Sequence, residues 1–171
     1  MNIQYIKDSD VTAVLDKKIR TLLSGCFVKN QDAEIFSRQR FYNEMPAHRY
    51  ILWDKEHLIA HIAVHDKNVL VDGIEYAISG IAEVCVEANY RKQGLVKTLL
   101  THVHQDRMQY GDAYSILFGD TEIYASSGYR VVNNLKALNR NKAWSVTGHT
   151  MIHALNKSWP SDCVKLIGIP F

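Results

Sequence analysis

Apolar residues alternate with polar ones at the start of the chain and then change to a helical spacing. Residues 2–7 (NIQYIK) alternate as a short strand does. Residues 8–10 (DSD) then offer N-caps to a helix that ends near Gly25. The apolar residues of this helix are Val11, Val14, Leu15, Ile19, Leu22 and Leu23. We therefore expect a strand followed by an amphipathic helix.

Two longer patterns occupy the middle of the chain. Residues 58–65 (LIAHIAVH) alternate, residues 72–73 (Asp-Gly) suit a tight turn, and the apolar run returns over 74–86. This pattern predicts a hairpin of two long strands. After Asn89 the period changes to that of a helix of about four turns that reaches Tyr110. Its apolar stripe consists of Leu95, Val96, Leu99, Leu100 and Val103.

Shorter patterns complete the series of elements. The expected elements are a helix at 31–41 that Pro46 separates from a strand at 49–54, a strand at 114–119, a helix at 121–127 that ends at Gly128, and strands at 129–132, 151–155 and 164–167. Residues 133–148 show no clear period and are expected to form a loop. The order of strands and helices predicts an α/β or α+β domain with a mixed sheet flanked by helices.

Composition and charge exclude several classes of protein but do not identify a binding partner. The chain has 171 residues, of which 47% are hydrophobic, so we expect residues 1–171 to form one domain. Its formal charge of +2 indicates neither a nucleic-acid surface nor an acidic tail. The three cysteines suit a reducing compartment, and no apolar stretch suits a signal peptide or a membrane span. We therefore expect a cytoplasmic protein that binds neither nucleic acid nor membrane.

The passage from the strand at 74–86 into the next helix is the most informative part of the sequence. The first turn of a helix leaves about four amide N–H groups without partners and carries a partial positive charge. Gly94 would let an anion approach the backbone, and Arg91, Lys92 and Lys97 add positive charge. Neither common nucleotide fingerprint, G-x-G-x-x-G or the P-loop, is present. The turn predicts a phosphate site, although a solvated turn closed by a glycine also fits.

Residues 91–96 (RKQGLV) resemble the R/Q-x-x-G-x-G/A signature of the GNAT N-acetyltransferase superfamily. The resemblance implies a mostly antiparallel sheet in which a splayed pair of strands holds acetyl-CoA. It implies that main-chain groups of the strand pair with the pantetheine arm and that the turn binds the pyrophosphate. The residues so assigned are Val84, Cys85, Val86, Arg91, Lys92, Gln93, Gly94, Leu95, Val96 and Lys97. Val96 departs from the family pattern, which usually has Gly or Ala at that position.

Glu83 is the first candidate catalytic residue. It interrupts an otherwise apolar strand, where a carboxylate is costly unless it faces a cleft or is paired. Loss of solvent would raise its pKa toward the range of a useful general base. An ion-paired Glu at the sheet edge is the alternative interpretation.

Tyr124 is the second candidate. It lies in the stretch 119–129 (GDTEIYASSGY), which resembles the Y-x-x-x-G-[FYW] stretch of the same family. The resemblance places its hydroxyl near the coenzyme sulfur, where a phenol would return a proton to the departing thiolate. An aromatic ring that packs without a catalytic role is the alternative interpretation.

The resemblance is greatest to the aminoglycoside 2′-N-acetyltransferase branch and its bacterial relatives. In that branch a Glu at the position of Glu83 is associated with deprotonation through water, and the Tyr at the position of Tyr124 with acid catalysis. The expected acceptor is a primary amine of a small molecule such as an aminoglycoside or amino sugar. Carboxylates that would attract such a cation are Asp32, Glu34, Glu44, Glu83, Asp120, Glu122 and the carboxylate of Phe171.

Other functions remain open from the sequence. A non-catalytic acyl-CoA-binding or regulatory module would agree with the bulky Val96, and a longer acyl donor is a further alternative. The histidines do not form a metal-ligand pattern, so no metal is expected. Cys85 fits a packed core thiol better than a nucleophile. The segment 164–171 offers a strand that would pair with a second subunit, which makes a homodimer possible.

Overall fold

The computed structural model describes residues 1–139 and 141–171, which divide into two compact units. The first unit contains residues 1–65, 82–102 and 171, and the second contains residues 66–81 and 103–170. Two long strands and one helix continue from one unit into the other: β3 (His57–Val71), β4 (Ile74–Val86) and α3 (Leu95–Tyr110). That residues 1–171 make a single domain stays a prediction.

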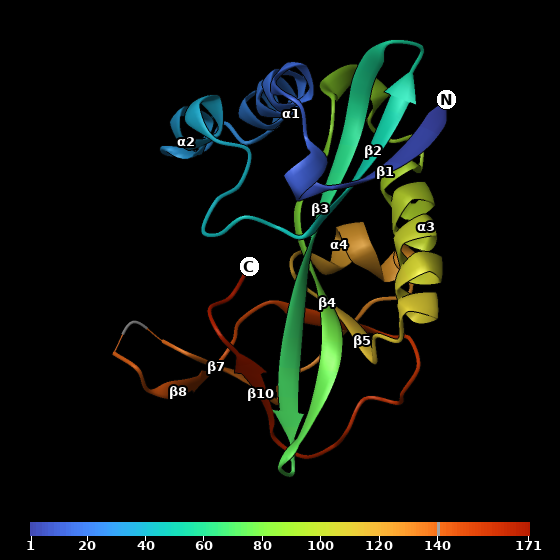
Figure 1. The fold of residues 1–171 in the computed structure, drawn as a ribbon. Coiled ribbons are helices and arrows are strands. Elements are labelled where there is room, and N and C mark those ends of the chain that lie inside the picture. The colour runs from blue at the N-terminus through green and yellow to red at the C-terminus, as the bar shows by residue number, and fades with distance from the viewer. Residues whose placement is uncertain (140) are drawn as a thin grey trace. The chain divides into compact units, whose positions relative to one another are not determined.

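The chain has a mixed α/β fold in which most neighbouring strands are antiparallel and helices flank the strands, as the sequence predicts (Figure 1). The remaining elements are β1 (Asn2–Lys7), η1 (Asp8–Asp10), α1 (Ala13–Cys26), α2 (Asp32–Arg38), β2 (His48–Asp54), η2 (Ala88–Tyr90), β5 (Tyr114–Phe118), α4 (Thr121–Tyr124), η3 (Ala125–Ser127), β6 (Arg130–Val131), β7 (Leu135–Leu138), β8 (Trp144–Val146), β9 (Thr150–Ala154) and β10 (Val164–Ile167).

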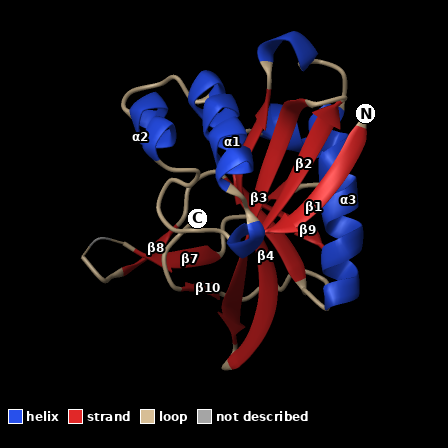
Figure 2. Cartoon of the chain, turned by 45° about the horizontal axis from the view of Figure 1, so that its top comes forward, coloured by secondary structure: helices blue, strands red, loops and turns tan. Residues whose placement is uncertain are grey.

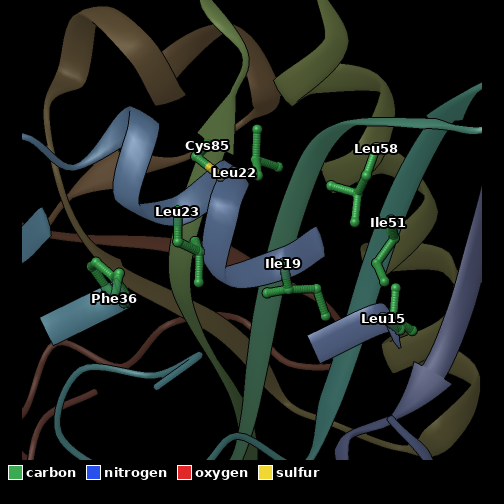
Figure 3. Packing of buried hydrophobic residues seen from close by; sticks show 8 residues of the cluster. All are labelled: Leu15, Ile19, Leu22, Leu23, Phe36, Ile51, Leu58 and Cys85. Atoms are coloured by element: carbon green, nitrogen blue, oxygen red, sulfur yellow. The ribbon is translucent and has the colours of Figure 1, made fainter. Parts of the chain in front are cut away.

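In the first unit, β1, β2 and β3 lie side by side with α1 and α2 close by (Figure 2). All three strands are antiparallel, and the β1 register pairs Tyr5 with Tyr50. The amphipathic face of α1 packs against β2, β3, α2 and β4 to form one apolar cluster (Figure 3). The cluster consists of Leu15, Ile19, Leu22, Leu23, Phe36, Ile51, Leu58 and Cys85.

The start of α1 differs from the sequence prediction. Thr12, rather than a residue of the segment 8–10, caps the helix, because its Oγ1 accepts a hydrogen bond of 3.3 Å from Leu15 N–H. Residues 8–10 form the short helix η1, in which Asp8 is buried and bound to arginines. Val14 was expected on the apolar face but is 71% exposed, because its neighbour Leu15 occupies the position that faces the cluster.

The predicted hairpin is present, and its turn has the expected chemistry. Asp72 (φ 47°) and Gly73 (φ 82°) are both left-handed, as a two-residue turn between twisted strands requires. In the second unit the strand order is β6-β9-β5-β4-β3-β10-β7-β8. β4 runs parallel to β5, and β10 runs parallel to β7, whereas β10 with β3, β5 with β9, β6 with β9 and β7 with β8 are antiparallel.

Two expectations for the C-terminal part are wrong. Residues 133–148 were expected to be a loop, yet they contain β7 and β8, which pair with each other. These short strands gain their backbone partners from the pairing of β7 with β10, and such a contact leaves no period in the local sequence. β10 itself lies between β3 and β7, so this strand is not an open edge for a second subunit.

Ile19→Ala should lower the free energy of unfolding by about 2–5 kcal/mol, because the fully buried Ile19 side chain would leave a cavity among buried neighbours. Val14→Ala on the same helix is the matched control and should change it by less than about 0.5 kcal/mol, since Val14 is exposed. Urea denaturation of both variants measures the difference. Equal losses in the two variants would contradict the packing of Ile19 in this cluster.

Candidate active site

The passage from β4 into α3 has the backbone of an anion site. After β4 ends at Val86, the chain forms η2 and then a turn in which Lys92 (φ 62°) and Gly94 (φ 75°) are left-handed. A Cβ on Gly94 would meet no atom within 4 Å, so this glycine serves the backbone conformation and does not relieve crowding. The turn leads directly into the first turn of α3, whose amides have no acceptor within the helix.

The side chains around this turn supply positive charge. Arg91, Lys92 and Lys97 are exposed, and the Arg91 Nε–H donates a hydrogen bond of 3.0 Å to the carbonyl of Val86. Gln93 is exposed and Leu95 is buried, whereas Val96 is half-buried. Exposed cations beside a helix N-terminus are suited to a phosphate or pyrophosphate, and the residues present therefore fit such a group.

Glu83 lies in β4 with a backbone conformation that strands rarely contain. Its φ of 44° is left-handed, which is uncommon for a residue with a side chain. The carbonyl of Glu83 accepts a hydrogen bond of 2.9 Å from Nδ1 of His61 on β3. His61 Nε2 must be the acceptor for Arg49, whose guanidinium donates only, so Nδ1 carries the proton. A neutral imidazole thus supports the irregular backbone at Glu83.

The carboxyl of Glu83 is held at one oxygen and unpartnered at the other. Oε1 accepts a hydrogen bond of 3.1 Å from the backbone N–H of Tyr42. Oε2 is buried and accepts no hydrogen bond from any residue that the structure describes. Burial raises the pKa of Glu83 to about 7, although the nearby Arg49 charge lowers it. A carboxyl with this pKa exchanges a proton near neutral pH, as a general base requires.

A buried ionic network behind Glu83 was not found by sequence reasoning. Arg49 is fully buried and donates from Nε to Asp8 Oδ1 at 2.5 Å and from Nη1 to His61 at 2.9 Å. Arg40 also binds Asp8, through Nη2 to Oδ2 at 2.7 Å. Burial raises the pKa of Asp8, but the two arginines together lower it by more and hold it below its usual value. Asp8 and Arg40 lie in polar stretches of the sequence, so no local pattern indicated this network.

The strand residues beside Glu83 are largely buried. Cys85 and Val86 are buried and Val84 is half-buried. Cys85 belongs to the apolar cluster of α1 (Figure 3), as a packed thiol would. Among the described residues, β4 pairs with β5 only at Ile78–Gly80, although β4 continues to Val86.

Tyr124 lies in the second unit, whereas Glu83 and the basic turn lie in the first. It ends α4, and its ring lies 6.1 Å from that of Tyr129 in an edge-on arrangement. A Cβ on Gly119 would lie 2.5 Å from the Tyr124 ring, so the glycine permits this close approach. Gly128 has φ 85° and ends the following η3, as the sequence predicts.

The described residues contain no group of three or more His, Cys, Asp or Glu side chains that would hold a metal ion. No helix in the described part of the chain is long and apolar enough to cross a membrane.

A family model described as an acetyltransferase (GNAT) domain matches residues 2–132. Among solved structures, a GNAT family N-acetyltransferase from Escherichia coli in complex with CoA is similar, with a TM-score of 0.70, 20% identity and coverage of 96% of this chain and 88% of that chain. A GNAT family acetyltransferase from Brucella melitensis in complex with acetyl-CoA has a TM-score of 0.64 and 17% identity, covering 95% and 94%. A probable N-acyltransferase from Enterococcus faecalis has a TM-score of 0.60 and 19% identity, covering 78% and 33%. No curated protein sequence matches the chain.

The stability of Glu83→Gln relative to wild type should increase as the pH rises. In the wild type the unfolded Glu ionises near its ordinary pKa of 4.5, whereas the folded one ionises at about 7, so stability is lost between these values. The stability of Glu83→Gln relative to wild type should therefore rise by up to about 3 kcal/mol from pH 4 to pH 8. Urea denaturation of both proteins at pH 4 and pH 8 measures this difference. Comparing the difference at the two pH values removes any effect of the amide that does not depend on pH.

Glu75→Gln is the matched control for this experiment, because Glu75 is an exposed residue of the same strand. Because Glu75 is exposed, its replacement should keep the free energy of unfolding within about 0.5 kcal/mol of wild type at both pH values. A flat difference for Glu83→Gln as well would show that the carboxyl of Glu83 is not desolvated.

Proposed function

The chain belongs to the acetyltransferase (GNAT) domain family, and on that premise we propose that it transfers an acetyl group from acetyl-CoA to a primary amine of a small molecule. The amine attacks the thioester directly. The observation that carries this proposal is the carboxyl of Glu83, which is buried, has a pKa of about 7 and has one oxygen without a partner among the described residues.

The turn and the end of β4 would hold acetyl-CoA. The first-turn amides of α3 and the charges of Arg91, Lys92 and Lys97 bind the pyrophosphate, with Gln93, Gly94, Leu95 and Val96 completing the turn. Main-chain groups of Val84, Cys85 and Val86 pair with the pantetheine arm as a strand would. The bound thioester supplies the activated acetyl group. The E. coli and B. melitensis structures hold CoA and acetyl-CoA, which supports this choice of donor.

Glu83 acts as the general base of the transfer. An amine is protonated at neutral pH and must lose a proton before it attacks. Oε2 of Glu83 accepts this proton, through a water molecule, while Oε1 stays bound to Tyr42 N–H. The neighbouring Arg49 keeps a fraction of Glu83 ionised at neutral pH by opposing the effect of burial.

Tyr124 acts as the general acid. When the tetrahedral intermediate collapses, the departing thiolate requires a proton, and a phenol is acidic enough to give one. The ring is fixed by its packing against Tyr129 and by the close approach to Gly119. A fixed ring limits the positions that the hydroxyl can take, which favours transfer to one atom.

The proposed acceptor is a polyamine sugar, such as an aminoglycoside or another amino sugar. The backbone of Tyr42 binds Glu83, and two residues further along the same loop Glu44 lies 3.6 Å from His65. The same loop therefore carries a second carboxylate two residues after the backbone group that binds Glu83. Carboxylates attract cationic amines and would orient such an acceptor.

Turnover of acetyl-CoA with a panel of amines tests the function, together with calorimetry of CoA binding. Acetyl transfer to amino sugars is the expected result. Tight CoA binding without transfer to any amine would favour a binding module instead, and faster turnover of longer acyl-CoA donors would change the donor. Absence of CoA binding would exclude both the enzyme and the module.

Glu83→Gln should lower kcat by about 10²–10⁴, because the amide cannot take the proton from the amine. In the wild type, kcat should rise with pH and level off above about 7, since the base must be ionised. A pH profile of kcat for both proteins measures this. Glu75→Gln, on the exposed part of β4, should keep the wild-type profile.

Tyr124→Phe should lower kcat by about 10² or more while the KM for the amine changes little, because the hydroxyl serves proton transfer and not acceptor binding. Steady-state kinetics with acetyl-CoA across pH provide the measurement. Tyr110→Phe, at an exposed position of the same unit, is the control. Full kcat in Tyr124→Phe at every pH would remove Tyr124 from the mechanism.

A further inference from the structure

Cys26 and Cys85 are distant in the sequence but adjacent in the first unit. Cys26 is the last residue of α1 and packs against the apolar cluster that contains Cys85. Its Sγ lies 3.4 Å from the carbonyl oxygen of Val86, the residue after Cys85. The two thiols are close enough that each changes the pKa of the other. Helix α1 and strand β4 therefore bring two sulfur atoms together at their ends.

The two thiols differ in their access to solvent. Cys26 is partly exposed and lies in the wall of a cavity of about 460 Å³ between α1, the start of β3 and the two residues that follow β4. Lys17, Lys18 and His57 are also in this wall. Cys85 is buried, with 6% of its surface exposed. A small molecule in the cavity would reach Cys26 first, with Cys85 behind it.

The surroundings of Cys26 favour its thiolate. The neighbouring Cys85 thiol lowers the pKa of Cys26 to about 7, and Arg91 adds to this, while burial and Glu87 act in the opposite direction. Burial raises the pKa of Cys85, which stays a thiol. Arg91 also donates to the Val86 carbonyl that Cys26 faces, so its charge is fixed beside the sulfur. Cys26 thus provides the nucleophilic sulfur of the pair, and the sulfur of Cys85 stays protonated.

We propose that Cys26 and Cys85 form a thiol modification site that reacts with hydroperoxides and closes to an intramolecular disulfide. The Cys26 sulfur attacks the outer peroxide oxygen, the O–O bond breaks, and the leaving oxygen departs as water or an alcohol after taking a proton. Cys26 is then a sulfenic acid. The Cys85 sulfur attacks the Cys26 sulfur, and the hydroxyl leaves as water with the Cys85 proton. Two thiols are oxidised and one peroxide is reduced.

The disulfide joins the end of α1 to β4 beside the residues assigned to the proposed function. Cys85 lies two residues after Glu83, and the Val86 carbonyl connects the pair to Arg91 of the basic turn. A bond between the sulfurs removes the hydrogen bond that Cys26 makes to Val86. Oxidation is therefore expected to reduce acetyl transfer, a consequence that depends on the proposed function, whereas the formation of the bond does not.

Treatment of the native protein with hydrogen peroxide, followed by alkylation under denaturing conditions and peptide mass spectrometry, tests the site. The expected result is a peptide pair joined through Cys26 and Cys85 in most molecules, with Cys163 still alkylated and the pair separated by dithiothreitol. Cys163 is the internal reference because it is exposed. Oxidation of Cys163 at the same rate, without the joined peptides, would overturn the proposal.

Variants separate the two steps and guard against misfolding. In Cys85→Ser the reaction should stop at a sulfenic acid on Cys26, which dimedone labels. In Cys26→Ser, Cys85 should stay unmodified. Cys163→Ser should behave as wild type. If Cys85→Ser does not fold, the pH dependence of iodoacetamide labelling of Cys26 in Cys163→Ser tests the proposal instead. The labelling rate should rise with pH with a midpoint near 7, whereas a midpoint near that of a free cysteine, about 8.5, would overturn the proposal.

Discussion

The buried ion pair between Asp8 and Arg49 is the interaction on which the first unit depends. Neither charge is tolerable alone in the interior, because the cost of removing each from water requires the partner and further hydrogen bonds. Arg49 uses all three nitrogens, toward Asp8, His61 and the carbonyl of Arg40. One guanidinium therefore fixes the N-terminal turn, the segment before β2, and strand β3 relative to one another.

The same arrangement sets the chemistry of Glu83. His61, held neutral because burial and Arg49 lower its pKa to about 3, donates to the Glu83 carbonyl and supports its left-handed backbone. Burial raises the pKa of the Glu83 carboxyl, Arg49 lowers it, and Asp8 partly cancels the effect of Arg49. The pKa near 7 is a balance of opposed effects, so the ion pair sets the pKa of Glu83 as well as holding the fold together. Strand β4 then carries the carboxyl, the buried thiol and the entry to the basic turn.

Features that depend on neighbouring residues were predictable. The Asp72-Gly73 turn, the apolar stripe of α3 and the end of a helix at Gly128 all follow from local backbone chemistry. The position of Glu83 in an apolar strand indicated a desolvated carboxyl, and the folded chain buries it. The cap at Thr12 and strands β7 and β8 were missed, because the burial of Asp8 and the pairing with β10 are distant contacts.

The sequence by itself determined the order of the elements apart from β7 and β8, the membership of the GNAT family and the residues of the basic turn, since periodicity and motifs are properties of adjacent positions. Only the tertiary structure decided that His61 hydrogen-bonds to the carbonyl of Glu83 and that Cys26 lies close to Cys85. These contacts join residues that no local pattern connects. Their chemistry follows from burial and from the charges placed nearby, and both exist only once the chain has folded.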